Sequence, residues 1–118
     1  MLTLLNLKCS KYKSSFGIKN VTLKEGTQAH FPDSVTERGT KHLRELSQVS
    51  KDGDRAVMLY IVQRNDCEHF SVAKNIDPLY AKTLKESLKE GVEILAYECI
   101  VTEDEIKVYK PLPINLDF

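Results

Sequence analysis

The sequence contains few cysteines, and the three that are present lie far apart. No pair among Cys9, Cys67 and Cys99 has the spacing of metal ligands. An odd, unclustered count is typical of free thiols in a reducing compartment, so we expect a cytoplasmic protein. Cys67 lies in a polar segment beside His69, so a catalytic nucleophile is one interpretation of this residue. A buried or unreactive thiol is the more common case. The cysteines therefore favour neither a disulfide-stapled fold nor a zinc site.

The sequence also lacks an excess of charge and any long apolar run. Its 118 residues include 17 Lys and Arg and 17 Asp and Glu, so the formal net charge is zero. Any binding to nucleic acid must therefore come from basic residues gathered on one face. The apolar stretch MLTLLNL has seven residues, whereas a transmembrane helix needs about 20. Because Lys8 follows this stretch instead of preceding it, a signal peptide is not indicated and no membrane partner is expected.

Hydrophobic patterning predicts seven elements in the order β-β-α-β-α-β-β. Strands are expected at residues 2–7, 15–23, 55–63, 92–102 and 105–110, and helices at 35–51 and 77–91. The run at 55–63 is almost wholly apolar, which suits a central strand covered on both faces. Segments 24–34 and 64–75 are expected to be loops. Helices alternating with buried strands predict an α/β fold, a mixed sheet flanked by helices, in a single domain over residues 1–118.

The second predicted helix has clearer end signals than the first. Asp77 fits the N-cap, Pro78 fits the first helical position, and Gly91 fits the C-terminal stop. In the first helix, Gly39 costs about 1 kcal/mol relative to alanine. The apolar residues expected to face the core are Val35, Leu43, Leu46 and Val49 in the first helix and Leu79, Leu84 and Leu88 in the second.

Basic residues on a strand and on the first helix are candidates for a phosphate-binding site. Lys19 lies near the end of a predicted strand, where a lysine can hold a phosphate or stabilise charge beside a carboxylate-bound Mg²⁺. Basic groups near a helix start can also meet phosphates. Residues three or four apart share a helix face, which pairs Arg38 with His42 and Lys41 with Arg44.

Each of these candidates has a plainer explanation when it is taken alone. Lys19 is also typical of a surface lysine at a strand end. The helix charges also fit a solvated face with internal pairs, such as Glu37 with Lys41. Asp33 offers a carboxylate for a metal, but an aspartate beside a proline ahead of a helix is usually a turn or capping residue.

The stretch QRNDCEHF raises a further alternative. Gln63 and Arg64 end the predicted central strand, where open α/β sheets place their sites. Asp66, Glu68 and His69 offer metal ligands in principle. Their spacing matches no specific site, so a polar loop is the favoured interpretation.

Four segments carry a specific resemblance to a known family. They are IKNVTLKEGTQAHFPDSVTERGTKHLREL, DRAVMLYIVQR, IDPLYAKTLKESLKEGVEILAYE and KPLPINL. Together they closely resemble the sugar fermentation stimulation proteins, the SfsA family, over residues 16–118. The block FPDSVTERGTKHLREL is long and unusual, which makes the resemblance specific.

The resemblance implies a fold and a partner. Members of the family resemble two-part proteins, in which an N-terminal OB-like domain precedes a restriction-endonuclease-like domain of the PD-(D/E)xK type. The chain resembles the C-terminal domain alone, so we expect the OB-like domain to be absent. The family is described as DNA-binding and linked to regulation of sugar metabolism, including maltose use, in bacteria. The implied partner is double-stranded DNA, contacted mostly at phosphates through Lys19, Arg38, Lys41, His42 and Arg44.

The sequence departs from the family pattern at the nuclease motif. The family strand resembles EVKNVTL, whereas this chain has GIKNVTL, so Gly17 stands at the glutamate and Lys19 at the lysine. An earlier family aspartate, in a strand resembling VDFLL, corresponds to Thr3. Mg²⁺ prefers hard oxygen ligands, usually including one or two carboxylates. The departure therefore predicts no metal cofactor, and Lys19 remains as a vestige of the catalytic motif.

The leading hypothesis is a catalytically silent DNA-binding domain, and two alternatives stay open. In the first, Asp33 or Glu37 rebuilds the metal site and the chain is a Mg²⁺-dependent DNA nuclease. In the second, the chain is a truncated, residual structural protein or an oligomer that pairs through exposed strand edges at LTLLNL and KVYK.

Overall fold

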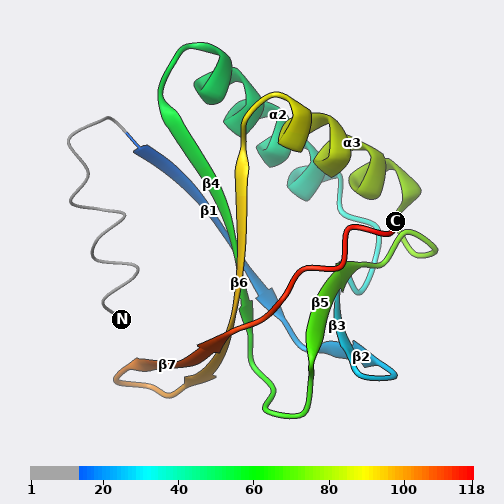
Figure 1. The fold of residues 1–118 in the computed structure, drawn as a ribbon, viewed down its shortest axis with the longest axis vertical. Coiled ribbons are helices and arrows are strands. Elements are labelled where there is room, and N and C mark those ends of the chain that lie inside the picture. The colour runs from blue at the N-terminus through cyan, green and yellow to red at the C-terminus, as the bar shows by residue number, and fades with distance from the viewer. Residues whose placement is uncertain (1–13) are drawn as a thin grey trace.

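The larger of two β-sheets forms the centre of the molecule (Figure 1). The computed structural model describes residues 14–118, so the predicted strand at 2–7, with Thr3, and Cys9 lie outside the described residues. The larger sheet has the strand order β1-β4-β6-β7. These strands are β1 Ser14–Val21, β4 Arg55–Val62, β6 Glu93–Val101 and β7 Ile106–Pro111. Strands β1, β4 and β6 run parallel and β7 runs antiparallel to β6, so the predicted mixed sheet is confirmed.

Strand β4 organises the core, as its apolar sequence predicts. Every residue from Ala56 to Val62 is buried. Tyr60 stacks on Phe70 with ring centroids 4.4 Å apart, and Phe31 lies 5.6 Å from the Tyr60 ring and 5.3 Å from the Tyr80 ring. These four aromatic rings join the larger sheet to the smaller sheet and to helix α3, Pro78–Lys89.

One aspartate, Asp77, links the starts of the two helices. Helix α2, Glu37–Lys51, has Thr36 as its N-cap, and the Gly39 N–H donates to Thr36 Oγ1 at 3.0 Å. Asp77 caps α3 as predicted, since the Tyr80 N–H donates to Asp77 Oδ1 at 3.1 Å. The other oxygen of Asp77 accepts from the Thr36 N–H at 2.9 Å. The chain turns after α3 at Gly91, with φ of 100°, as its sequence predicts.

The apolar faces of the helices differ in part from the prediction. Val35 is 69% exposed because it precedes the N-cap, and Leu79 is 51% exposed because it lies in the first turn on the outer side. Leu84 is fully buried as predicted, and Tyr80, four residues before it on the same face, is fully buried in place of Leu79. The helices also meet through a buried hydrogen bond of 2.9 Å from Ser47 Oγ to Ser87 Oγ. Neither of the two described helices is long and apolar enough to cross a membrane.

The predicted loops at 24–34 and 64–75 are wrong in part, because a second sheet is built from them. This sheet has the order β2-β3-β5, with β2 Leu23–Glu25, β3 Gln28–Phe31 and β5 His69–Val72. Gly26, with φ of 62°, permits the tight turn between β2 and β3. The parallel pairing of β3 and β5 sets Ala29 beside Phe70, both fully buried. Strands of three or four residues are too short to show a clear alternation in the sequence.

Candidate anion-binding groove

A groove opens between strand β1 and helix α2, and its lining is mostly basic. Its volume is about 530 Å³. We call it the β1–α2 groove, and its lining residues are Ile18, Lys19, Arg38, Lys41, His42 and Glu45. It brings together four of the five basic residues that the sequence singles out. The fifth, Arg44, is exposed on α2 and lies outside this lining.

The secondary structure explains how these side chains converge. On β1, Gly17 and Lys19 are two residues apart, so they point to the same face of the sheet. Helix α2 packs against β1 and β4. Arg38 and His42 are four residues apart on α2, and Glu45 follows three residues later, so these side chains lie on adjoining turns of one helix.

Gly17 leaves a space that neighbouring side chains occupy. A Cβ atom at position 17 would lie 2.7 Å from Met58 Cε and 2.8 Å from His42 Cε1. Real Cβ atoms do not approach other atoms this closely. The imidazole of His42 and the thioether of Met58 therefore lie where a side chain at this strand position would begin.

The charges of the groove act on one another. Partial burial and, after it, the charge of Arg38 lower the pKa of Lys19. The pKa of His42 is also lowered, first by burial and then by Lys19, and Glu45 opposes this shift in part. Repulsion of this kind means that the cations are close together, and an anion placed among them would relieve it.

Glu45 provides little compensation for this positive charge. Its carboxylate lies 3.9 Å from Lys41 Nζ, in an exposed pair of side chains. Pairs of this kind contribute little to stability because water screens them. Within residues 14–118, neither Lys19 nor Arg38 has a carboxylate within ion-pair distance.

The donor set of the groove does not fit a divalent metal ion. Mg²⁺ and Ca²⁺ need several oxygen ligands, which in proteins usually include carboxylates. Gly17 supplies no side chain, and Glu45 is the single carboxylate among the lining residues. Asp33 and Glu37 are exposed and do not line the groove. Nowhere in the described part of the chain do three or more His, Cys, Asp or Glu side chains form a group that could hold a metal.

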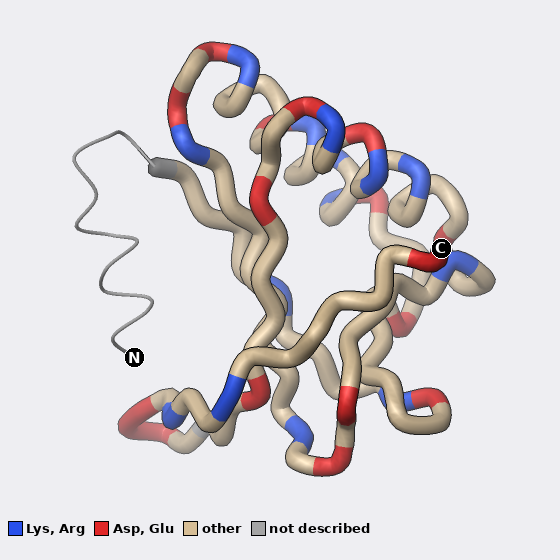
Figure 2. The backbone as a smooth tube through the Cα atoms, viewed as in Figure 1, with Lys and Arg blue, Asp and Glu red and all other residues tan. Residues whose placement is uncertain are grey.

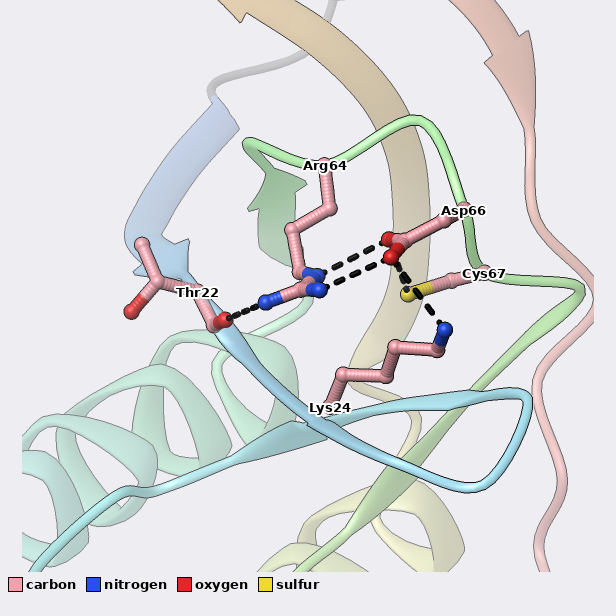
Figure 3. Close-up of polar contacts among 5 residues, drawn as sticks. All are labelled: Thr22, Lys24, Arg64, Asp66 and Cys67. Carbon is pink, nitrogen blue, oxygen red and sulfur yellow. Dashed lines mark hydrogen bonds and ion pairs between the residues drawn. The ribbon is translucent and has the colours of Figure 1, made fainter.

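The polar stretch after β4 serves a structural purpose. Figure 3 shows Arg64 holding Asp66 through two hydrogen bonds, of 2.9 Å from Nε and 2.8 Å from Nη2. Lys24 Nζ donates to the same carboxylate at 3.2 Å, and Arg64 Nη1 donates to the Thr22 carbonyl at 3.2 Å. Hydrogen bonds from Arg64 and Lys24 hold the pKa of Asp66 well below its usual range. This cluster ties the segment after β4 to the start of β2. The carboxylate of Asp66 is therefore already bound by Arg64 and Lys24.

The two described cysteines are buried free thiols. Burial raises the pKa of Cys67, and the neighbouring Asp66 raises it further. A thiol in this setting stays protonated and is a poor nucleophile. Cys67 is therefore a core residue, as the more common of the two interpretations expects.

Charge elsewhere on the molecule is mixed in sign. Figure 2 shows acidic and basic residues interspersed along both helices, while the central strands of the larger sheet are largely uncharged. This agrees with the net charge of zero. The β1–α2 groove is thus a local concentration of positive charge on a molecule that has no overall excess.

Comparison with known proteins places the chain in a family. The family model described as "Sugar fermentation stimulation protein RE domain" matches residues 5–105. The chain belongs to the sugar fermentation stimulation protein family. The resemblance inferred from its sequence is therefore confirmed.

Individual members of this family are similar in sequence and in fold. A sugar fermentation stimulation protein homolog of Geobacter metallireducens is 52% identical over 99 residues, covering 84% of this chain and 43% of that protein. A homolog from Paramagnetospirillum magneticum is 50% identical over 99 residues, covering 84% of the chain and 42% of the homolog. The structure of Pyrococcus furiosus SfsA in complex with Ca²⁺ matches with a TM-score of 0.83 and 34% identity, over 91% of this chain and 47% of that one.

These matches confirm the α/β fold and set a limit on the comparison. The chain spans less than half the length of the family members it matches.

Two features of the groove were not predicted from the sequence. Glu45 lies four residues after Lys41, a spacing that is visible in the sequence. The packing of His42 over Gly17 depends on how α2 is placed on the sheet, and no sequence pattern reveals it.

Proposed function

We propose that this chain is a DNA-binding domain that contacts phosphates through the β1–α2 groove and does not cleave DNA. The observation that carries the proposal is the convergence of Lys19, Arg38 and His42 in one groove. Burial and then the nearby positive charges lower the pKa of Lys19 and of His42. A phosphate in the groove would offset this repulsion. Contacts to phosphates position a protein on DNA without reading its sequence, so binding is salt-dependent and weakly sequence-selective.

The absence of cleavage follows from the chemistry of the donors. Phosphoryl transfer by a two-carboxylate metal site requires oxygen ligands that position the ion. The strand position two residues before Lys19 holds a glycine, and the space beside it is filled by Met58 and His42. Lys19 keeps its capacity to contact a phosphate oxygen, but the groove supplies no activated water.

The family relationship supports a cellular setting for this binding. The proposal extends to the regulation of sugar metabolism, including maltose use, in bacteria, which the resemblance implies. We place it in the cytoplasm because an odd, unclustered cysteine count is typical of a reducing compartment. The net charge of zero argues for moderate affinity in the chain by itself. The matched family members carry additional length, and we propose that part of it contributes further DNA contacts in those proteins.

The rival proposal is a metal-dependent nuclease. The observation that favours it concerns a relative, since the Pyrococcus furiosus SfsA structure is described as a complex with Ca²⁺. Asp33 and Glu37 would have to move to the groove to supply ligands in this chain. Calorimetric titration with Mg²⁺ and Mn²⁺ separates the two proposals, because the nuclease requires saturable metal binding and the silent domain predicts none.

Variants of the groove test the DNA-binding proposal. Lys19→Ala and Arg38→Ala should each weaken binding to labelled double-stranded DNA. Each variant should also reduce the slope of log affinity against log salt by about 0.9 for the phosphate contact that it removes. Lys89→Ala, at an exposed position in the last turn of α3, is the matched control and should bind as the parent does. No binding at low salt, or binding that is equally strong in all three variants, would overturn the proposal.

A further inference from the structure

His42 is the one titratable ring in the β1–α2 groove, and it is held between the sheet and the cations. Its Cε1 atom packs over Gly17 on β1, beside Met58 of β4. Neither Gly17 nor Met58 has a titratable side chain. The charged groups facing it are Lys19 from β1 and Arg38, Lys41 and Glu45 from its own helix. The ring is half-buried, so it is held in place and still borders the groove.

The balance of these groups keeps the ring neutral in the free protein. Burial and the neighbouring Lys19 lower the pKa of His42, and Glu45 opposes them only in part. A histidine whose pKa lies below its ordinary value is uncharged at neutral pH. In the free groove, His42 can therefore still take up a proton and add a positive charge.

A phosphate in the groove changes this balance. An opposite charge within a few ångströms favours the protonated imidazolium and raises its pKa. By linkage, a ligand that raises the pKa of a group binds more tightly at the pH values where the group takes up a proton. We propose that His42 couples DNA binding to proton uptake, so that the β1–α2 groove binds DNA phosphates more tightly as the pH falls.

Gly17 contributes to this coupling by leaving space for the His42 ring. A side chain at position 17 would meet the His42 ring at 2.8 Å and force it out of its present place. The glycine thus makes room for the imidazole beside Lys19. The inference rests on the proposed function, and it adds a role for one residue and a direction for the pH dependence.

The test compares DNA affinity across pH at constant ionic strength. The DNA phosphodiester does not titrate between mildly alkaline and mildly acidic pH, so the protein is the source of any change. The affinity of the parent chain should rise as the pH falls through and below the ordinary histidine pKa, by at most about tenfold per pH unit for a single linked proton. His42→Gln should bind with less pH dependence and keep binding through Lys19 and Arg38. His69→Gln is the matched control, since His69 is exposed on β5 and does not line the groove.

A second measurement needs no variant. Nuclear magnetic resonance titration of the His42 ring should show a higher pKa with a short DNA duplex present than without it. An unchanged His42 pKa, or a His42→Gln chain as pH-dependent as the parent, would overturn this inference and leave the DNA-binding proposal standing. Absence of DNA binding at every pH and low salt would overturn both.

Discussion

Replacing Gly17 with alanine tests the packing on which the groove depends. The new methyl group would lie within 3.0 Å of Met58 Cε, Met58 Sδ and His42 Cε1, so at least one of these side chains must move. Overpacking a well-filled site typically costs about 1–3 kcal/mol. Gly17 is not among the glycines with positive φ, so alanine fits the backbone and recovers about 0.4–1 kcal/mol through the unfolded chain.

These opposing terms give a definite expectation. The atoms in the way are the ends of flexible side chains, which holds the cost near its lower bound of about 1 kcal/mol. Subtracting the recovered amount of about 0.4–1 kcal/mol leaves an expected net loss of no more than about 0.6 kcal/mol in the free energy of unfolding. Urea unfolding at neutral pH measures this loss, with an unchanged dependence on denaturant showing that the folded state is otherwise intact. The displaced His42 ring should become more exposed, and its pKa should move up toward the ordinary value.

A second variant isolates the contact with His42. In a His42→Ala background the ring is gone, so Gly17→Ala should cost less than it does in the parent chain, although the Met58 contacts remain. Residues in direct contact show coupling of about 0.5–3 kcal/mol in such cycles. A Gly17→Ala chain that is more stable than the parent, with the same His42 pKa, would refute the reasoning about this site.

Three further predictions concern other parts of the structure. Tyr60→Phe and Tyr80→Phe each leave one buried hydroxyl without its partner, so each should lower the free energy of unfolding by about 1–3 kcal/mol, and the double variant should cost less than the sum. Asp77→Ala removes the acceptor for the N–H groups of Thr36 and Tyr80; urea unfolding should show a loss of about 2 kcal/mol or somewhat more, since loss of one cap alone costs about 0.5–2 kcal/mol. Because the pKa of His42 is lowered in the folded chain, the unfolded chain binds a proton more readily at mildly acidic pH. The free energy of unfolding should therefore fall as the pH drops below about 6.5. His42→Gln should lessen this fall.

The sequence predicts the elements whose signals are local. The run from Ala56 to Val62 is apolar enough to indicate a central strand without knowledge of its neighbours. Asp77 and Pro78 mark the start of α3 because capping acts within a few residues of the helix end. The mixed sheet follows from the alternation of such strands with helices.

Features that depend on distant partners could not be predicted in this way. Strands β3 and β5 each have four residues and are separated by an entire helix and a strand in the chain. They are strands because they pair with neighbours in the folded chain, β3 with β2 and β5, and β5 with β3. The groove is similar, because spacing along α2 shows that Arg38 and His42 share a face but not that this face meets Lys19. Only the placement of α2 on the sheet sets His42 over Gly17.

The central claim is that the β1–α2 groove binds DNA phosphates without hydrolysing them. The most direct measurement titrates the purified chain with labelled double-stranded DNA at low and high salt, with and without Mg²⁺, and then separates the DNA on a gel. The account predicts a complex at low salt that weakens at high salt, with the DNA intact whether or not Mg²⁺ is present. Cleavage that requires Mg²⁺ would contradict it, because a metal site would then have been assembled from carboxylates other than one at position 17.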